Sequence, residues 1–180
     1  MLIRCTYVGG PITEAKQGVA NGPCVVAKLG DGMKDTLTVT GSAEGIKLGS
    51  ALMDTSIQLP ANPQALTPAQ ITAIMKQPVN AIFAMKDNVI LAAQIEAPGI
   101  FHHSSLFSGQ PVQCAGTIKT DATGKLLELT NDSGHYKPAA PCLFNVLHKL
   151  KTDGYTGTGY KVLDKAKGGT GTELTPPAWV

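Results

Sequence analysis

Three of the chain's four histidines fall in two short polar clusters that lie about thirty residues apart. Residues 101–105 carry His102 and His103 beside two serines, and residues 133–136 carry His135 beside a tyrosine. An imidazole titrates near neutral pH, so it can act as an acid, a base or a metal ligand with little tuning. We therefore take five side chains of the clusters as candidate catalytic residues: His103, Ser104, Ser105, His135 and Tyr136.

The first interpretation of these residues is acid–base chemistry. His103 or His135 would take a proton from one of the serines or from a substrate hydroxyl, and Asp132 would orient the imidazole. A general base must lie about 2.6–3.2 Å from the atom whose proton it removes. The chain has no Gly-x-Ser-x-Gly elbow, so this interpretation depends on the residue types and their proximity alone.

Of three other interpretations, one is not expected and two stay open. A metal site is not expected, because His102 and His103 are neighbours and point to opposite faces of an extended strand. A group-transfer pocket would use the serine hydroxyls to bond ribose or amide groups and the tyrosine ring to stack on a base, with a cofactor that the residues do not identify. In the structural interpretation, the serines cap a short turn and the second cluster bonds backbone groups at the end of a hairpin.

A predicted hairpin would bring the two clusters together. Residues 112–119 and 125–130 read as strands on either side of a polar turn that ends in Gly124. The first cluster precedes one strand and the second follows the other, so both should emerge at the same end of the hairpin.

The remaining elements are short and separated by turns. Strands are expected at residues 2–8, 23–29, 36–40, 80–85, 89–95 and 160–163, with a hairpin turn at residues 86–88. A capping box starting at Thr67 predicts one helix, and apolar residues at helical spacing from 143 to 150 predict another that ends at Asp153-Gly154. Residues 42–66 are expected to form a long surface excursion with one short strand near Ile57.

These elements predict an α+β fold, a mainly antiparallel sheet with two short covering helices. At 180 residues the chain is expected to form one domain over residues 1–164, followed by a flexible tail at 165–180.

The composition excludes several classes of function. A net charge of +2 with scattered lysines argues against nucleic-acid binding, and no apolar run approaches the roughly 20 residues of a membrane span. Four cysteines without metal-like spacing are expected to be buried free thiols, although a disulfide between Cys5 and Cys24 stays open. No cleavable signal peptide is evident, which favours a cytoplasmic protein before any export.

Residues 86–163 resemble a known module. Residues 101–106 read Phe-His-His-Ser-Ser-Leu, residues 115–116 Ala-Gly and residues 133–138 Ser-Gly-His-Tyr-Lys-Pro. This order is similar to the His-Ser-Ser-Phe-Leu-Ala-Gly … Ala-Ala-Gly … Ser-Gly-His-Tyr-x-Pro module of plant IQ-motif calmodulin-binding proteins and of bacterial effector- and toxin-like proteins. The chain departs from the module at Leu106-Phe107, and it has no Ile-Gln-x-x-x-Arg segment, so the resemblance does not imply calmodulin binding.

The resemblance implies a small secreted bacterial effector or toxin-like protein, exported without a cleavable signal peptide. Its His/Ser/Tyr pocket would transfer a group to or from a nucleotide or protein target, with nicotinamide nucleotides as the first substrate class to test. The alternative is a non-enzymatic module that binds a host protein or a component of a secretion apparatus. The residues do not decide between enzyme and binding module. No candidate catalytic glutamate stands directly after the second cluster, which argues against the enzyme.

Overall fold

The computed structural model describes residues 31–56, 81–93, 102–134 and 136–180. The strands predicted at 2–8 and 23–29, the helix predicted from Thr67, and His135 lie outside the described residues. The prediction of a single domain over 1–164 therefore stays a prediction.

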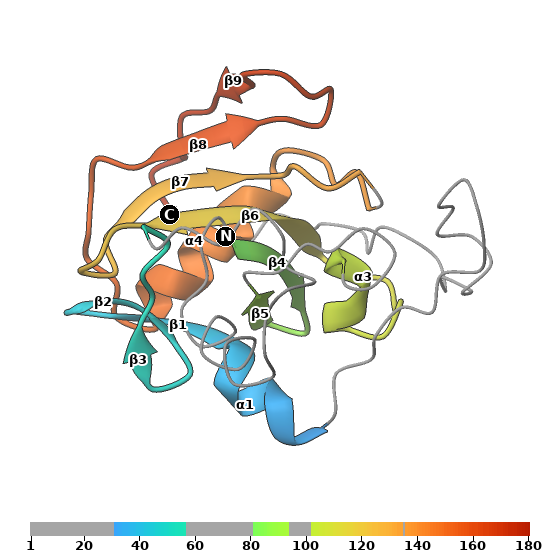
Figure 1. Cartoon of the computed structure of the whole chain (residues 1–180). Helices are drawn as coiled ribbons and strands as arrows, with labels where there is room; N and C mark the ends of the chain where they lie inside the picture. Colours follow the sequence, from blue (N-terminus) through green and yellow to red (C-terminus); the bar gives the residue numbers. More distant parts are fainter. Residues whose placement is uncertain (1–30, 57–80, 94–101, 135) are drawn as a thin grey trace.

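The described part of the chain is built around one nine-stranded sheet with the strand order β3-β2-β1-β5-β4-β6-β7-β8-β9 (Figure 1). Every neighbouring pair is antiparallel except β7 and β8, which run parallel. The strands are β1 (Thr38–Ser42), β2 (Gly45–Leu48), β3 (Ala51–Leu52), β4 (Ala81–Lys86), β5 (Val89–Ala93), β6 (Cys114–Thr120), β7 (Leu126–Thr130), β8 (Lys161–Asp164) and β9 (Thr172–Glu173). The helices are α1 (Lys34–Leu37), α3 (His103–Leu106) and α4 (Cys142–Thr152), with a 3-10 turn at Asp31–Met33. The predicted α+β fold with a mainly antiparallel sheet is confirmed.

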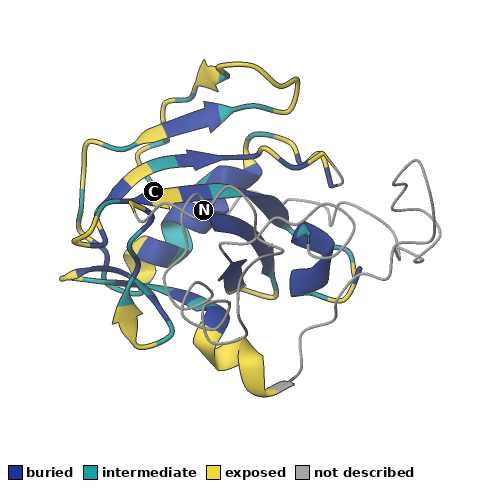
Figure 2. Cartoon of the chain, in the orientation of Figure 1, coloured by how far each residue is buried: buried dark blue, intermediate teal, exposed yellow. Residues whose placement is uncertain are grey.

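Two layers of side chains cover the centre of the sheet, one on each face. In β4, Phe83 and Met85 join the core under α4, whereas Ile82 and Ala84 join a second cluster that contains Leu106 of α3. Successive residues of a strand point to opposite faces, so a strand covered on both sides must be apolar throughout. This explains why β4 and β5 are continuously apolar rather than alternating, and why the centre of the sheet is buried (Figure 2).

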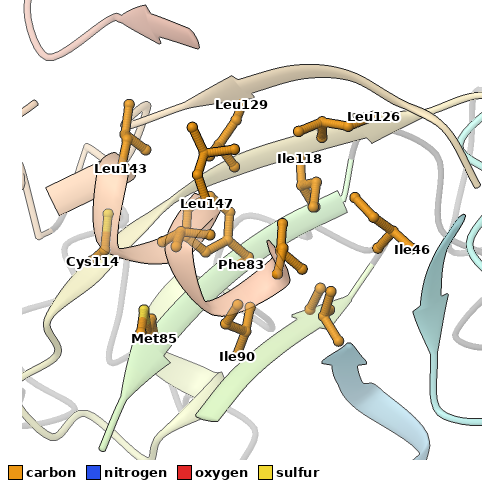
Figure 3. Close-up of a cluster of buried hydrophobic side chains, with 14 of the residues drawn as sticks. Ile46, Phe83, Met85, Ile90, Cys114, Ile118, Leu126, Leu129, Leu143 and Leu147 are labelled. Atoms are coloured by element: carbon orange, nitrogen blue, oxygen red, sulfur yellow. The ribbon is translucent and has the colours of Figure 1, made fainter. Parts of the chain in front are cut away.

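Helix α4 covers one face of the sheet. Its residues Leu143, Val146, Leu147 and Leu150 recur at the spacing of one helical face and are buried against the strands (Figure 3). Asp153 and Gly154 end the helix, and Gly154 has a φ of 113° that only glycine adopts at little cost. The helix predicted from this spacing is confirmed.

The close packing of α4 on β1 requires a glycine. A Cβ atom on Gly41 would lie 1.9 Å from the carbonyl oxygen of Leu150, so no side chain fits at this position.

Both predicted hairpins are present, as β4–β5 and β6–β7. Asp87 and Asn88 have positive φ values of 51° and 61°, the conformation of a two-residue hairpin turn. Cys114 and Cys142 are buried free thiols as predicted, while Cys5 and Cys24 lie outside the described residues.

The prediction for residues 42–66 is wrong in its described part. Residues 45–48 and 51–52 form β2 and β3 rather than a surface excursion, and Ile57 lies outside the described residues. The predicted strand at 36–40 is displaced, because α1 ends at Leu37 and β1 begins at Thr38. These strands are too short to show a strand pattern in the sequence; β2 is stabilised by pairing with β1, and β3 by pairing with β2.

Hydrogen bonds join the β2–β3 end of the sheet to the end of β6 and the turn that follows it. Thr55 Oγ1 donates to the Thr120 carbonyl at 2.6 Å and accepts from the Thr120 amide at 2.7 Å. Thr120 Oγ1 donates to the Met53 carbonyl at 2.5 Å, and the Ile46 amide donates to the Gly124 carbonyl at 2.8 Å. The sheet is therefore curled, since β2 and the residues just after β3 are bonded to the end of β6 and the turn that follows it, which are not their neighbours in the strand order.

The C-terminal residues contact the outside of α4. Leu174 and Val180 pack against the core, and the Trp179 ring meets His148 edge-on with the ring centres 5.7 Å apart. Contacts in one conformation do not measure motion, so the flexibility predicted for 165–180 stays a prediction. Among the described residues, no helix is long and apolar enough to cross a membrane.

Candidate functional site

The first histidine cluster folds into the short helix α3. The His102 amide donates to Ser105 Oγ at 3.1 Å, and the Ser105 amide donates to the His102 carbonyl at 2.8 Å. Serine is favoured at a helix start because its hydroxyl bonds backbone groups that the first turn leaves without partners. The cluster is therefore a helix-initiating sequence, and α3 places His103, Ser104 and Ser105 against the sheet.

The three candidate side chains on α3 are buried. Ser104 and Ser105 are 0% exposed and His103 is 4% exposed. His103 Nε2 lies 2.9 Å from the carbonyl oxygen of Gly116 in β6. A carbonyl only accepts hydrogen bonds, so Nε2 carries the proton in this contact. His103 thus ties α3 to the middle of the sheet.

The second cluster forms a tight turn after β7. The Tyr136 amide donates to Ser133 Oγ at 3.3 Å, and the Lys137 amide donates to the Ser133 carbonyl at 2.9 Å. Tyr136 is 3% exposed, and burial raises its pKa to about 12.

Tyr136 is the residue through which the two clusters meet. Its ring packs in the cluster that contains Leu106, Val112 and Ala115, and its hydroxyl donates to the Gln110 carbonyl at 2.8 Å. Tyr136 of the second cluster therefore contacts the loop that follows α3, while the predicted approach of His103 and His135 stays a prediction. His135 lies outside the described residues, so the distance between the two imidazoles is not part of this description.

Two strained residues flank this contact. Ser108 has a φ of 53° and Lys137 has a φ of 45°, both in the left-handed region. Lys137 also precedes Pro138, and a residue before proline is driven toward extended conformations. Such conformations cost about 1–3 kcal/mol each and persist where the surroundings enforce them. Among the exposed residues on this part of the molecule are Ser108, Gln110 and Lys137, and these three together we call the motif surface.

Further polar contacts bind the loop after α3 to strand β4. The Gln110 side chain bonds Lys86 at the end of β4, and the Gln113 amide donates to the Met85 carbonyl at 2.7 Å. The loop after α3 is therefore bound to the β4–β5 hairpin as well as to Tyr136. Gln110 and Gln113 were not among the sequence candidates, because glutamines in a loop carry no pattern that separates them from solvated residues.

Asn131 ties the second cluster to the end of β8, the strand next to β7. Its side-chain amide donates to the Pro138 carbonyl at 3.0 Å and to Asp164 Oδ1 at 2.8 Å, and its Oδ1 accepts from the Lys165 amide at 2.7 Å. The side chain is fully buried, so these three bonds offset its desolvation. The sequence offers no sign of this role, since asparagine after a strand is an ordinary turn residue.

Gly116, the second residue of the Ala-Gly pair, is required by close packing of β6 on β7. A Cβ atom at this position would lie 1.8 Å from the Thr130 carbonyl oxygen. The same residue supplies the carbonyl that His103 bonds. Among the described residues, no group of three or more His, Cys, Asp and Glu side chains is placed to hold a metal ion.

Comparison with protein families places both clusters in one matched segment. The model of the IQ motif-containing protein middle domain matches residues 66–142, which is less than half of the chain. The match runs from before β4 to the first residue of α4, so it includes the candidate site and excludes β8 and β9. The resemblance to IQ-motif proteins is thereby supported for this segment. No curated protein and no solved structure matched the chain.

Proposed function

We propose that this chain is a non-enzymatic protein-interaction module that binds its partner through the motif surface. The observation that carries the proposal is the bond from the buried Tyr136 hydroxyl to the Gln110 carbonyl, which ties the second motif to the loop that follows α3. In this arrangement the motif residues brace a surface rather than line a pocket.

The burial of the candidate catalytic residues supports this proposal over an enzymatic one. A general base needs direct contact with a substrate proton, whereas the His103 ring is almost fully buried and its Nε2–H is bonded to the Gly116 carbonyl. Ser104 and Ser105 are sealed from solvent, so neither hydroxyl reaches a substrate without movement of α3. The catalytic assignment of these residues and of His135 stays a prediction.

The strained backbone supports the choice of surface. Ser108 and Lys137 hold costly conformations on either side of the Tyr136–Gln110 contact, and their side chains are exposed. Strain on exposed loops concentrates at binding and catalytic sites, because a rigid scaffold then presents fixed side chains to a partner. The match to a domain of IQ motif-containing proteins agrees with protein binding, although the chain lacks the Ile-Gln-x-x-x-Arg segment itself. Export as a bacterial effector, and a host or secretion-apparatus partner, stay predictions from the sequence.

Site-specific photo-crosslinking tests the proposal. A photoreactive residue is introduced in turn at Gln110 and at Lys137, and the control carries it at Thr172, an exposed position on β9. The expected result is a discrete crosslinked species from Gln110 and Lys137 in cells that produce the protein, and none from Thr172. Equal or absent crosslinking at all three positions would refute binding through the motif surface.

A turnover assay tests the enzymatic alternative directly. The protein and its Ser104→Ala variant are incubated with nicotinamide and adenine nucleotides, and the melting temperature of each is measured. Nucleotide turnover that Ser104→Ala abolishes at an unchanged melting temperature would contradict a purely structural role for this serine.

A further inference from the structure

A second surface lies on the face of β6, β7 and β8 that points away from α4. Ile118, Leu129 and Val162 of these strands belong to the core beneath α4. Their chain neighbours point to the opposite face, since side chains alternate along a strand. That face therefore carries Lys119, Glu128 and Lys161.

The strand register aligns these three residues in one row. Lys119 pairs with Glu128 across β6 and β7, and Glu128 pairs with Lys161 across β7 and β8. Neighbouring strands lie about 4.8 Å apart, so the two lysine backbones are about 10 Å apart. The sheet holds both lysines at a fixed spacing.

The carboxylate between the lysines is engaged elsewhere. Glu128 Oε1 lies 2.9 Å from Nζ of Lys165, which arrives from the segment after β8. Lys119 and Lys161 are exposed and form no ion pair within the part of the chain that the structure describes. The row therefore presents two cationic groups that the neighbouring acid does not neutralise.

We infer that this row, the lysine row, binds an acidic protein segment in an extended conformation. Same-side residues of an extended chain lie about 7 Å apart, and the flexible lysine side chains can reach two such carboxylates from backbones about 10 Å apart. Nucleic acid fits less well, because β6, β7 and β8 carry no aromatic residue on which a base could stack. Glu173 on β9 pairs with Leu163 beside the row and limits the cationic area at that side.

The inference is independent of the motif surface and uses different residues. The test measures fluorescence anisotropy of a labelled peptide of alternating Glu and Ser at low salt, with a Gln-Ser peptide as the uncharged match. The site variant is Lys119→Glu/Lys161→Glu, and the control is Lys125→Glu/Lys167→Glu, which makes the same change of net charge at two exposed lysines outside the row.

The expected result is that the Glu-Ser peptide binds the wild-type protein and that the site variant weakens binding by at least about tenfold, since two attractive contacts become repulsive. The control variant should change binding by less than about threefold, through the long-range field alone. Equal weakening by both variants, equal binding of the Gln-Ser peptide, tighter binding of single-stranded oligothymidine at the same salt, or no binding to the wild-type protein would each overturn the inference.

Discussion

The hydroxyl of Tyr136 should have opposite effects on stability at neutral and at strongly alkaline pH. The substitution Tyr136→Phe keeps the ring that packs against Leu106 and Val112 and removes only the hydroxyl. The hydroxyl donates to the Gln110 carbonyl at 2.8 Å. Gln110 is an exposed residue, so water can reach the vacated carbonyl and the loss should be that of an ordinary hydrogen bond, about 1 kcal/mol at pH 8.

The effect of alkali follows from the pKa of Tyr136. Burial raises this pKa from 10.0 to about 12 in the folded protein, so the folded state keeps the proton over a range in which the unfolded chain has lost it. A folded pKa above the unfolded one gives stability that is complete below about pH 10 and is lost as the pH rises to about 12. Two pKa units correspond to at most about 3 kcal/mol.

These two effects have opposite signs, so the stability difference between wild type and Tyr136→Phe should reverse. The wild-type protein should be about 1 kcal/mol more stable at pH 8, equal near pH 11, and less stable than the variant above that. Urea unfolding at a series of pH values from 8 to about 11.5 measures the difference, and the other titrating groups are common to both proteins.

A second buried tyrosine gives a comparison at pH 8. The pKa of Tyr155 is also raised by burial, and its hydroxyl accepts a bond from the Leu126 amide at 2.8 Å. Tyr155→Phe should orphan that buried amide and therefore cost more than Tyr136→Phe at pH 8. A Tyr136→Phe difference that stays constant from pH 8 to 11.5 would refute the burial of an unionised Tyr136 hydroxyl and with it the proposed brace between the two motifs.

Three further predictions concern contacts that shape the sheet and the site. Thr55→Val removes both hydrogen bonds to the Thr120 backbone and should lower the free energy of unfolding by about 2–4 kcal/mol. Thr55→Ser keeps the hydroxyl and should cost less than about 1 kcal/mol. Equal losses in urea unfolding would contradict the role of the hydroxyl. Gly116→Ala places a methyl group against the Thr130 carbonyl and should cost at least about 3 kcal/mol or prevent folding, so a near-native melting temperature would show that β6 and β7 are not packed this closely. Asn131→Asp loses two donated bonds and brings a second carboxylate to Asp164. The free energy of unfolding should therefore fall by about 2–4 kcal/mol at pH 7 and partly recover near pH 4.5, where carboxyls begin to protonate. A pH-independent loss would refute the like-charge contact.

Local patterns in the sequence determined the hairpins and the helix α4, whose defining contacts lie between residues close in the chain. The two hairpins follow from apolar runs on either side of short polar turns, and α4 follows from apolar residues at helical spacing ended by Asp153-Gly154. The composition and these elements together sufficed for the α+β class. The sequence also located both polar clusters and the hairpin that brings the ends of β6 and β7 together.

Tertiary structure alone decided the short strands and the exposure of the candidate residues. Strands β2 and β3 have weak intrinsic preference; β2 pairs with β1, β3 pairs with β2, and the Thr55–Thr120 bonds, which span 65 residues, fix this end of the sheet to β6. A serine beside a histidine reads the same whether it faces solvent or the sheet. The packing of α3 on β4 and the bond from His103 to Gly116 bury this sequence. Burial depends on which other parts of the chain cover a residue, and the local sequence does not specify them.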